Sequence, residues 1–251
     1  MPEEPEEEVL AGGNLSHVVR VGVTVRRPTG PWTPTIHALL RHLDDFDGAP
    51  RLLGIDDQGR EILEHMPGAM AWPEMGVLAT DDGLARAADL LRRYHEAVAD
   101  FVVPADAVWQ FPDMAPDCEP FVGGEGMIVC HNDCAAWNLV MGGDRWAFID
   151  WDVAGPRPRI WDVAYAIRGM VLVDWDTDPR HRVEVFADAY GLDAIERRRL
   201  PEVVVARIQS SIDLMRRRGE AGEEPWATMW RSDHRSNWEA TRDFAARTLR
   251  P

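Results

Sequence analysis

The fold of this chain can be read outward from residues 128–152, which run IVCHNDCAAWNLVMGGDRWAFIDWD. The opening apolar residues are typical of a short buried strand, and the segment 131–138 that follows is polar. Two apolar runs then flank Gly142-Gly143-Asp144, which is the pattern of a β-hairpin. The hairpin returns the chain to the polar segment, so we expect Asp150, at its end, to lie beside that segment.

Three side chains with oxygen atoms meet in this predicted arrangement. Asn138 and Asp150 offer hard oxygen ligands that suit Mg²⁺, which takes few protein ligands and keeps water and phosphate oxygens. Asp133 can accept the proton of a hydroxyl group whose oxygen attacks phosphorus. The residue types therefore predict a catalytic base, Asp133, beside a metal site in a phosphoryl-transfer reaction.

The spacing H-x-D-x-x-x-x-N, followed by strand, turn, strand and I-D-W-D, resembles the aminoglycoside phosphotransferase and choline kinase family of kinase-like enzymes. His131, Asp133 and Asn138 match the catalytic loop of that family, and Asp150 matches its metal-binding aspartate. The segment 161–164, WDVA, also resembles a family element downstream of the loop. The resemblance implies an α+β, two-lobed protein-kinase-like fold, with a small β-rich N-terminal lobe and a larger helical C-terminal lobe.

The first 66 residues fit the small lobe, which the resemblance makes the nucleotide-binding lobe, 1–66. Short β-rich runs occupy 17–21, 23–27, 51–55 and 61–65. Thr33-Pro34 is predicted to open one intervening helix, with Thr33 as its N-cap and Pro34 at the first helical position.

Residues 67–251 fit the helical lobe, which would carry catalysis and acceptor binding. Met66-Pro67-Gly68 marks the boundary before it. Gly191 and Gly219 are predicted to end helices, and a last helix is predicted over 227–249.

One residue that the family relies on is absent. All 27 basic residues are arginine, so the chain contains no lysine for a Schiff base, a Walker A loop or the family's strand lysine. On the strand at 23–27, side-chain alternation turns Arg27 inward and Arg26 outward. Arginine can bridge phosphates, so Arg27 is predicted to replace the lysine. The family's helix glutamate is also missing, and His37 is predicted to accept a hydrogen bond from Arg27; alternatively, Arg27 is solvated and His37 is a half-buried histidine without this role.

The resemblance implies further nucleotide contacts. Gly12, Gly13 and Ser16 lie where a loop covers the phosphates, and the segment from Glu64 to Met66 resembles the linker whose backbone hydrogen-bonds adenine. The implied cofactors are Mg²⁺ and ATP (or GTP) as phosphoryl donor. Asp152 is expected in the substrate wall or as a supporting carboxylate, and Asp162 is expected to bond the backbone of the catalytic loop.

The net charge limits the classes of partner that the chain is expected to bind. The formal net charge is −16, which argues against a nucleic-acid partner. A small hydroxyl-bearing acceptor with cationic groups, such as an amino sugar or aminoglycoside, would be attracted by this charge; the other interpretation is that the charge only maintains solubility. No run of about 18 apolar residues predicts a membrane span.

The cysteines and the chain start favour a cytoplasmic protein. Three cysteines do not form a disulfide framework, and the acidic start is no signal peptide. Cys118, Cys130, His131 and Cys134 could suggest zinc, but Cys130 ends an apolar strand and is more simply a small buried residue. Two other functions stay open: a pseudokinase that binds a nucleotide or metabolite without turnover, and a metal-dependent phosphohydrolase.

Overall fold

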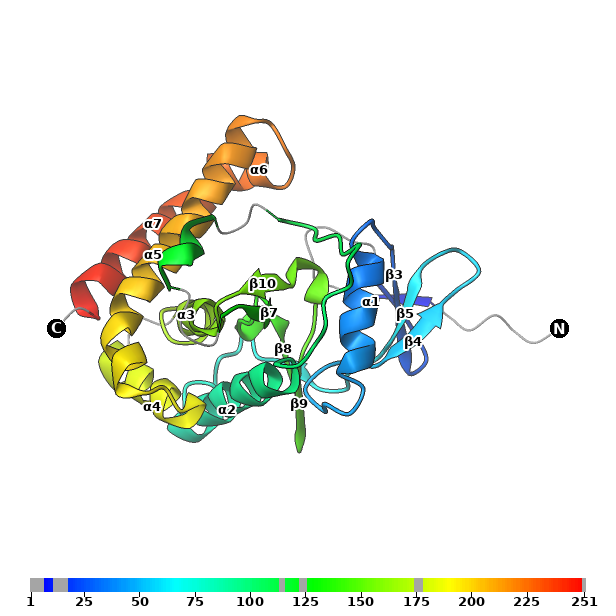
Figure 1. Cartoon of the computed structure of the whole chain (residues 1–251), viewed down its shortest axis with the longest axis horizontal. Helices are drawn as coiled ribbons and strands as arrows, with labels where there is room; N and C mark the ends of the chain where they lie inside the picture. Colours follow the sequence, from blue (N-terminus) through cyan, green and yellow to red (C-terminus); the bar gives the residue numbers. More distant parts are fainter. Residues whose placement is uncertain (1–6, 11–17, 113–115, 122–125, 174–177, 250–251) are drawn as a thin grey trace.

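A five-stranded antiparallel sheet forms the N-terminal part of the molecule (Figure 1). The computed structural model describes residues 7–10, 18–112, 116–121, 126–173 and 178–249. The strands lie side by side in the order β1 (Glu7–Val9), β2 (Val19–Val21), β3 (Thr24–Arg27), β5 (Glu61–Glu64) and β4 (Leu52–Ile55). Gly22 has φ of 61° in the tight turn between β2 and β3, a conformation that glycine adopts without strain.

Helix α1 (Thr33–His42) packs beside this sheet through a stripe of buried apolar residues that includes Ile36, Leu39 and Leu40. The predicted N-cap was wrong by one residue. Trp32 occupies the N-cap position without a side-chain cap, and Thr33 is the first helical residue. The Thr33 hydroxyl instead accepts a hydrogen bond from the Gly30 N–H at 2.8 Å, so it stabilises the turn before the helix.

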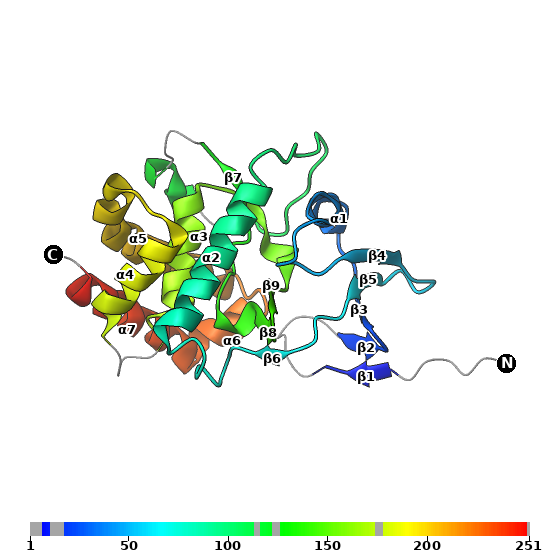
Figure 2. The same cartoon turned by 90° about the horizontal axis from the view of Figure 1, so that it is seen from below.

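Small β elements connect the sheet to the helices (Figure 2). The predicted hairpin is present as β8 (Leu139–Gly142) and β9 (Arg145–Phe148), with Gly143 at φ of 55° in its turn. Two strand pairings were not predicted, because each includes a strand of only two or three residues, β6 (Ala69–Met70) or β10 (Gly155–Arg157). β6 pairs with β8, and β10 pairs with β7 (Ile128–Cys130).

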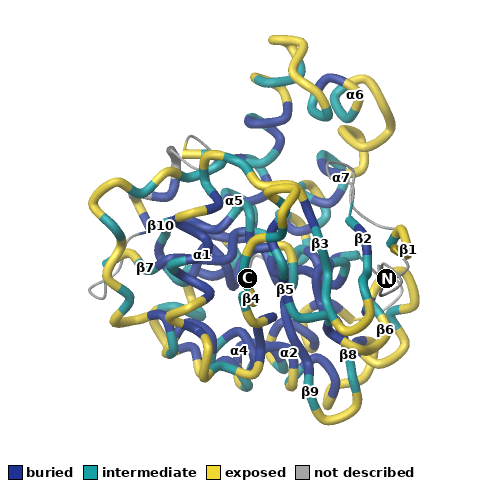
Figure 3. The backbone as a smooth tube through the Cα atoms, turned by 90° about the vertical axis from the view of Figure 1, so that its right-hand side faces the viewer, coloured by how far each residue is buried: buried dark blue, intermediate teal, exposed yellow. Residues whose placement is uncertain are grey.

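The C-terminal part is helical. Its helices are α2 (Asp81–Ala97), α3 (Arg159–Met170), α4 (Pro179–Tyr190), α5 (Ala194–Glu220), α6 (Trp226–Arg231) and α7 (Asp233–Thr248), with short 3₁₀ turns η1 (Pro116–Phe121), η2 (Ala136–Asn138) and η3 (Trp151–Val153). α5 packs against α3, α6 and α7, and α2 packs against α4. The large core of this part contains the fully buried rings of Trp151 and Trp161, and Figure 3 shows exposed residues around the rim of the molecule, including the protruding end near α6. None of the helices in the described ranges is long and apolar enough to cross a membrane.

The predicted helix ends were right at one glycine and wrong at the other. Gly191 ends α4 in the left-handed region, with φ of 83°. Gly219 lies inside the last turn of α5, where an added Cβ would lie 2.6 Å from the Cβ of Trp230. This glycine permits close packing of α5 against α6, and it does not end the helix. The predicted last helix is also divided, because Ser232 caps the N-terminus of α7 directly after α6.

Candidate active site

The polar loop after β7 is held by one buried carboxylate. Asp162 of α3 accepts the backbone N–H groups of His131 and Asn132, both at 2.7 Å. Burial raises the pKa of Asp162, but a hydrogen bond from His95 and the backbone bonds outweigh it, so the pKa is lowered and the group is charged. The expected structural role of Asp162 is confirmed by these bonds. Asn132 takes φ of 66° within this loop, a conformation that asparagine tolerates better than most residues.

His131 joins the loop to the hairpin. Its Nδ1 accepts the Asp133 N–H at 3.2 Å, so its Nε2 carries the proton and donates to the Ile149 carbonyl oxygen at 3.1 Å. The ring is fully buried, which lowers its pKa and keeps it neutral. His131 therefore positions the loop and is not itself a base.

Asp133 is held by three donors. Asn138 Nδ2 donates to its Oδ2 at 2.8 Å, Trp137 Nε1 donates to its Oδ1 at 3.2 Å, and the hydroxyl of Tyr165 donates a further bond. Burial raises the pKa of Asp133 to about 6, against these hydrogen bonds, which lower it. A carboxylate with this pKa is deprotonated at neutral pH and is a stronger proton acceptor than an ordinary aspartate.

The hairpin brings Asp150 to the loop, as predicted. The Ile149 N–H donates to the Asn138 carbonyl oxygen at 2.9 Å, so the end of β9 is tied to the end of the loop. Asp150 has φ of 64°, and half of its side chain is exposed. Its charge raises the pKa of both Asp133 and Asp152, which shows that negative charge is concentrated here. An excess of carboxylates together with an amide oxygen from Asn138 fits a divalent cation such as Mg²⁺.

Arg27 points inward and is buried, as side-chain alternation predicted. Its guanidinium contacts three carboxylates: Nε donates to Glu61, one terminal nitrogen to Asp150 at 3.0 Å, and the other to Asp152 at 2.6 Å. Arg27 and Glu61 face each other across β3 and β5. The arginine therefore connects the sheet to the end of the hairpin.

The predicted hydrogen bond between His37 and Arg27 was wrong. His37 Nε2 lies 2.9 Å from Glu61 Oε2 and does not bond Arg27, because Glu61 stands between them. Burial raises the pKa of Glu61, but hydrogen bonds from His37 and Arg27 outweigh it and lower the pKa. The glutamate that pairs with the arginine thus comes from the neighbouring strand and not from a helix.

Asp152 is partly buried, and its carboxylate is bound by Arg27. Burial and the nearby Asp150 raise the pKa of Asp152 to about 6, although Arg27 lowers it. Asp152 therefore lies beside the predicted metal ligand, where it supports the position of Arg27.

The predicted nucleotide contacts are placed only in part. Gly12, Gly13 and Ser16 lie outside the described residues. Glu64 ends β5, where its carboxylate binds Arg145 at 2.6 Å, and Met66 packs with Val140 and Ala147. The linker backbone therefore passes from the sheet to the hairpin next to the catalytic loop.

Two comparisons place the chain among known proteins. Residues 97–202 match the phosphotransferase enzyme family. The trifolitoxin immunity protein of Rhizobium leguminosarum bv. trifolii is 30% identical over 250 residues, which cover 90% of this chain and 92% of that protein. The chain belongs to the phosphotransferase enzyme family. The family resemblance found in the sequence is thus confirmed.

Solved structures with low sequence identity share the phosphotransferase fold. A choline/ethanolamine kinase family protein from Mesorhizobium loti has a TM-score of 0.67 at 16% identity, covering 98% of this chain and 92% of that one. An amicoumacin kinase in complex with AMP-PNP, Ca²⁺ and Ami has a TM-score of 0.68 at 13% identity, covering 100% and 91%. The predicted two-lobed α+β kinase-like fold is therefore confirmed.

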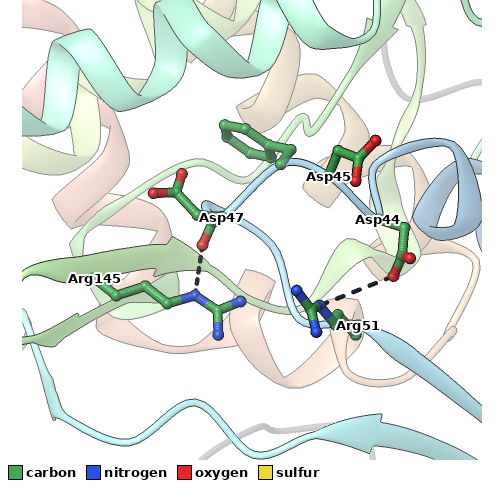
Figure 4. A pocket seen from close by; sticks show the side chains of 6 residues that line it. Asp44, Asp45, Asp47, Arg51 and Arg145 are labelled. Atoms are coloured by element: carbon green, nitrogen blue, oxygen red, sulfur yellow. Dashed lines mark hydrogen bonds and ion pairs between the residues drawn. The ribbon is translucent and has the colours of Figure 1, made fainter.

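A surface pocket of this phosphotransferase is lined by residues outside the catalytic loop (Figure 4). It is formed by the loop 44–47 after α1, Arg51 and Arg145. Both arginines are engaged: Arg145 Nε donates to the Asp47 carbonyl oxygen at 2.8 Å, and Arg51 Nε lies 4.0 Å from Asp44. The pocket contains none of the predicted site residues, so we assign it no part in catalysis.

The zinc alternative gains no support from the geometry. Within the described ranges, the ligand atoms that converge are those of His95, Cys130 and Asp162, and not the set predicted with Cys118 and Cys134. His95 and Asp162 are already bonded to each other and to neighbouring groups. Burial raises the pKa of the Cys130 thiol, so it stays protonated and is a poor metal ligand.

Sequence reasoning missed four residues around this phosphotransferase site: Glu61, Tyr165, Arg168 and Arg207. Arg207 of α5 is buried and donates to the Asn132 carbonyl oxygen at 3.0 Å, which adds a second attachment of the loop besides Asp162. Glu61 carried a usable signal, because two adjacent antiparallel strands place their residues in register. Tyr165, Arg168 and Arg207 lie on long helices with no local pattern to distinguish them.

Proposed function

We propose that this phosphotransferase moves the γ-phosphoryl group of ATP or GTP to a hydroxyl group of a small molecule, with Mg²⁺ bound by Asn138 and Asp150. The observation that carries the proposal is the position of Asp133. It is a partly buried carboxylate with a pKa of about 6, held by Asn138 on the same loop that is tied to Asp150 through the hairpin.

In this mechanism the acceptor hydroxyl donates its proton to Asp133 while its oxygen forms a bond to the γ-phosphorus. The bond from that phosphorus to the bridging oxygen breaks, and the nucleoside diphosphate leaves. Asn138 and Trp137 keep the carboxylate of Asp133 oriented through their hydrogen bonds. Bound Mg²⁺ would neutralise the charge that develops on the phosphate oxygens.

Arg27 is proposed to contact the nucleotide phosphates. A guanidinium has five N–H groups, and the contacts with Glu61, Asp150 and Asp152 use three of them. One remaining N–H group is on the nitrogen that bonds Asp150, the proposed metal ligand, and the other is on the nitrogen that bonds Asp152. The backbone of the linker from Glu64 to Met66 is proposed to bind the base, and Gly12, Gly13 and Ser16 to cover the phosphates.

The test is a screen of hydroxyl compounds with ATP or GTP and Mg²⁺, in which the product is identified by mass as the phosphorylated acceptor. We expect transfer by the wild type and almost none by Asp133→Asn. Binding of nucleotide without transfer to any acceptor would favour the pseudokinase alternative. Release of phosphate from phosphate esters without a nucleotide would favour the phosphohydrolase alternative.

A second candidate function is immunity to a toxin, because the relative that is 30% identical is named a trifolitoxin immunity protein and the match covers 92% of it. In this proposal the toxin is the phosphoryl acceptor. A sensitive strain that expresses this chain should tolerate more trifolitoxin than the same strain expressing Asp133→Asn. Equal protection by both would separate immunity from phosphoryl transfer.

A further inference from the structure

Arg168 reaches from α3 into a group of aromatic rings beside Asp133. Its guanidinium carbon lies 3.8 Å from the ring centre of Trp238 and 4.9 Å from that of Trp137. Trp137 is the residue whose indole N–H donates to Asp133. Arg168 is therefore separated from the proposed base by a single side chain.

The guanidinium of Arg168 has no partner for its hydrogen bonds in the parts of the chain that the structure describes. Its Nε is buried and unbonded, and no described carboxylate lies within ion-pair distance. The residue as a whole is only partly buried. A partly desolvated cation that lacks an anion is unfavourable, and an anionic ligand would relieve this.

A second arginine adds positive charge at the same place. The guanidinium carbon of Arg207 lies 4.4 Å from the ring centre of Tyr165, which itself bonds Asp133. Burial lowers the pKa of both Arg168 and Arg207. Two arginines thus accompany Asp133, and the indole faces that could have received a cationic ligand already hold the cation of Arg168.

We propose that Arg168 binds a carboxylate of the acceptor whose hydroxyl group faces Asp133. The inference rests on the proposed transferase function and names its substrate class: a hydroxyl compound that carries a carboxylate. Arginine binds a carboxylate through two parallel hydrogen bonds, which would orient the acceptor relative to Asp133. Trp137 and Trp238 would provide apolar walls on either side of this pair.

The net charge of −16 works against an anionic acceptor only at long range. At physiological ionic strength, interactions between exposed charges are screened beyond about 8 Å. A carboxylate paired with a half-buried guanidinium is screened much less. The local ion pair with Arg168 therefore outweighs the repulsion by the net charge. The cationic acceptor that the net charge predicts is the alternative that the tests below distinguish.

The binding test uses acetate and acetamide as probes, at constant ionic strength and without nucleotide. The indole N–H resonances of Trp137 and Trp238 are assigned with Trp→Phe variants and followed during each titration. We expect acetate to shift them saturably and acetamide not to shift them. Arg168→Gln should abolish the shift, whereas Arg235→Gln should retain it, because Arg235 is an exposed arginine stacked 4.9 Å from the ring centre of Trp230.

An acetate titration without a saturable shift, or the same shift in Arg168→Gln, would overturn the proposal. Because no nucleotide is present, this result stands whether or not the protein transfers phosphoryl groups. Wild-type-like circular dichroism of Arg168→Gln shows that the variant is folded, and Arg168→Lys, which keeps the charge but loses the fork, should bind acetate less tightly than the wild type.

The kinetic test compares each carboxylate-bearing acceptor with its methyl ester. Masking the carboxylate should lower kcat/KM of the wild type at least tenfold, and should change that of Arg168→Gln little. If Arg168→Gln lowers kcat equally for every acceptor, Arg168 contacts the transferred phosphoryl group and the proposal is wrong. Preference of the wild type for choline over acidic acceptors would also contradict it.

Discussion

The two arginine sites of the candidate active site are built in opposite ways. Arg27 lies among three carboxylates, those of Glu61, Asp150 and Asp152. Arg168 lies between two indole rings, and no described carboxylate pairs with it. Carboxylates neutralise the positive charge of a guanidinium and fix its position through ion pairs. Indole faces also hold it, through cation–π attraction, but leave its N–H groups free.

This difference shows how a chain without lysine assigns two tasks to one residue type. Arg27 is suited to connect the sheet with the predicted metal site, because three carboxylates fix its position and its two unused N–H groups can still reach a phosphate there. Arg168 is suited to bind an anion from solution, because nothing in the described fold balances it. Four changes, ordered by the size of the expected effect, test whether this comparison holds.

The largest effect is expected at Asp133, the proposed base. Asp133→Asn should lower turnover by roughly 10²–10⁴-fold, because it removes proton transfer while keeping the shape of the side chain. Nucleotide affinity and acetate binding should change little, since both arginines remain. Steady-state kinetics and nucleotide titration measure the two quantities. Asp144→Asn, in the exposed hairpin turn, is the control, and full activity of Asp133→Asn would refute the base assignment.

The second prediction compares stability at the two sites. Arg27→Met should lower the free energy of unfolding by about 3–5 kcal/mol, because it leaves the buried Glu61 without its main counter-charge. Arg168→Met should lower it by less than about 1.5 kcal/mol, because it leaves no carboxylate unpaired. Urea unfolding of both variants measures the difference. Equal losses would mean that the two arginines are not held differently.

The third prediction concerns the nucleotide. Arg27→Gln should raise the apparent KM for ATP roughly tenfold, the effect of about 1.4 kcal/mol in binding. Arg26→Gln should change it by less than about twofold, because Arg26 points away and pairs with Thr24 and Asp56. The two arginines are adjacent in sequence, and both variants lose one positive charge. A difference between them therefore reports the direction in which the side chain points and not the loss of charge. Similar effects of the two variants would remove Arg27 from the nucleotide site.

The smallest effect is expected in the pH dependence. Asp133, with a pKa of about 6, must be deprotonated to act as base, so kcat/KM should fall as the pH drops through 6. Tyr165→Phe removes a hydrogen bond that favours the charged form, which raises the pKa further and moves this fall to higher pH. Tyr94→Phe, which removes the Tyr94 hydroxyl that bonds the Val129 carbonyl oxygen, is the control and should leave the profile in place. An unchanged profile in Tyr165→Phe would exclude its role in tuning Asp133.

Local patterns predicted the parts of the site that are close in sequence. His131, Asp133, Asn138 and Asp150 lie within one strand–loop–hairpin unit, so their spacing was enough to bring them together. Strand alternation likewise predicted the inward direction of Arg27. The assignment of Gly219 as a helix stop failed for a physical reason: a glycine that permits close packing looks the same in sequence as one that ends a helix, and only the position of Trp230 separates them.

The partners of the two arginines depended on segments that are far apart in the chain. Arg27 meets Glu61 across 34 positions and Asp150 across 123. Arg168 meets Trp238 because α3 and α7 both pack against α5. The chain itself specifies the catalytic loop, since loop and hairpin close on each other over a few residues. Which charges are paired and which stay open is decided by the packing of distant helices and strands, because burial and counter-charges exist only once those elements have come together.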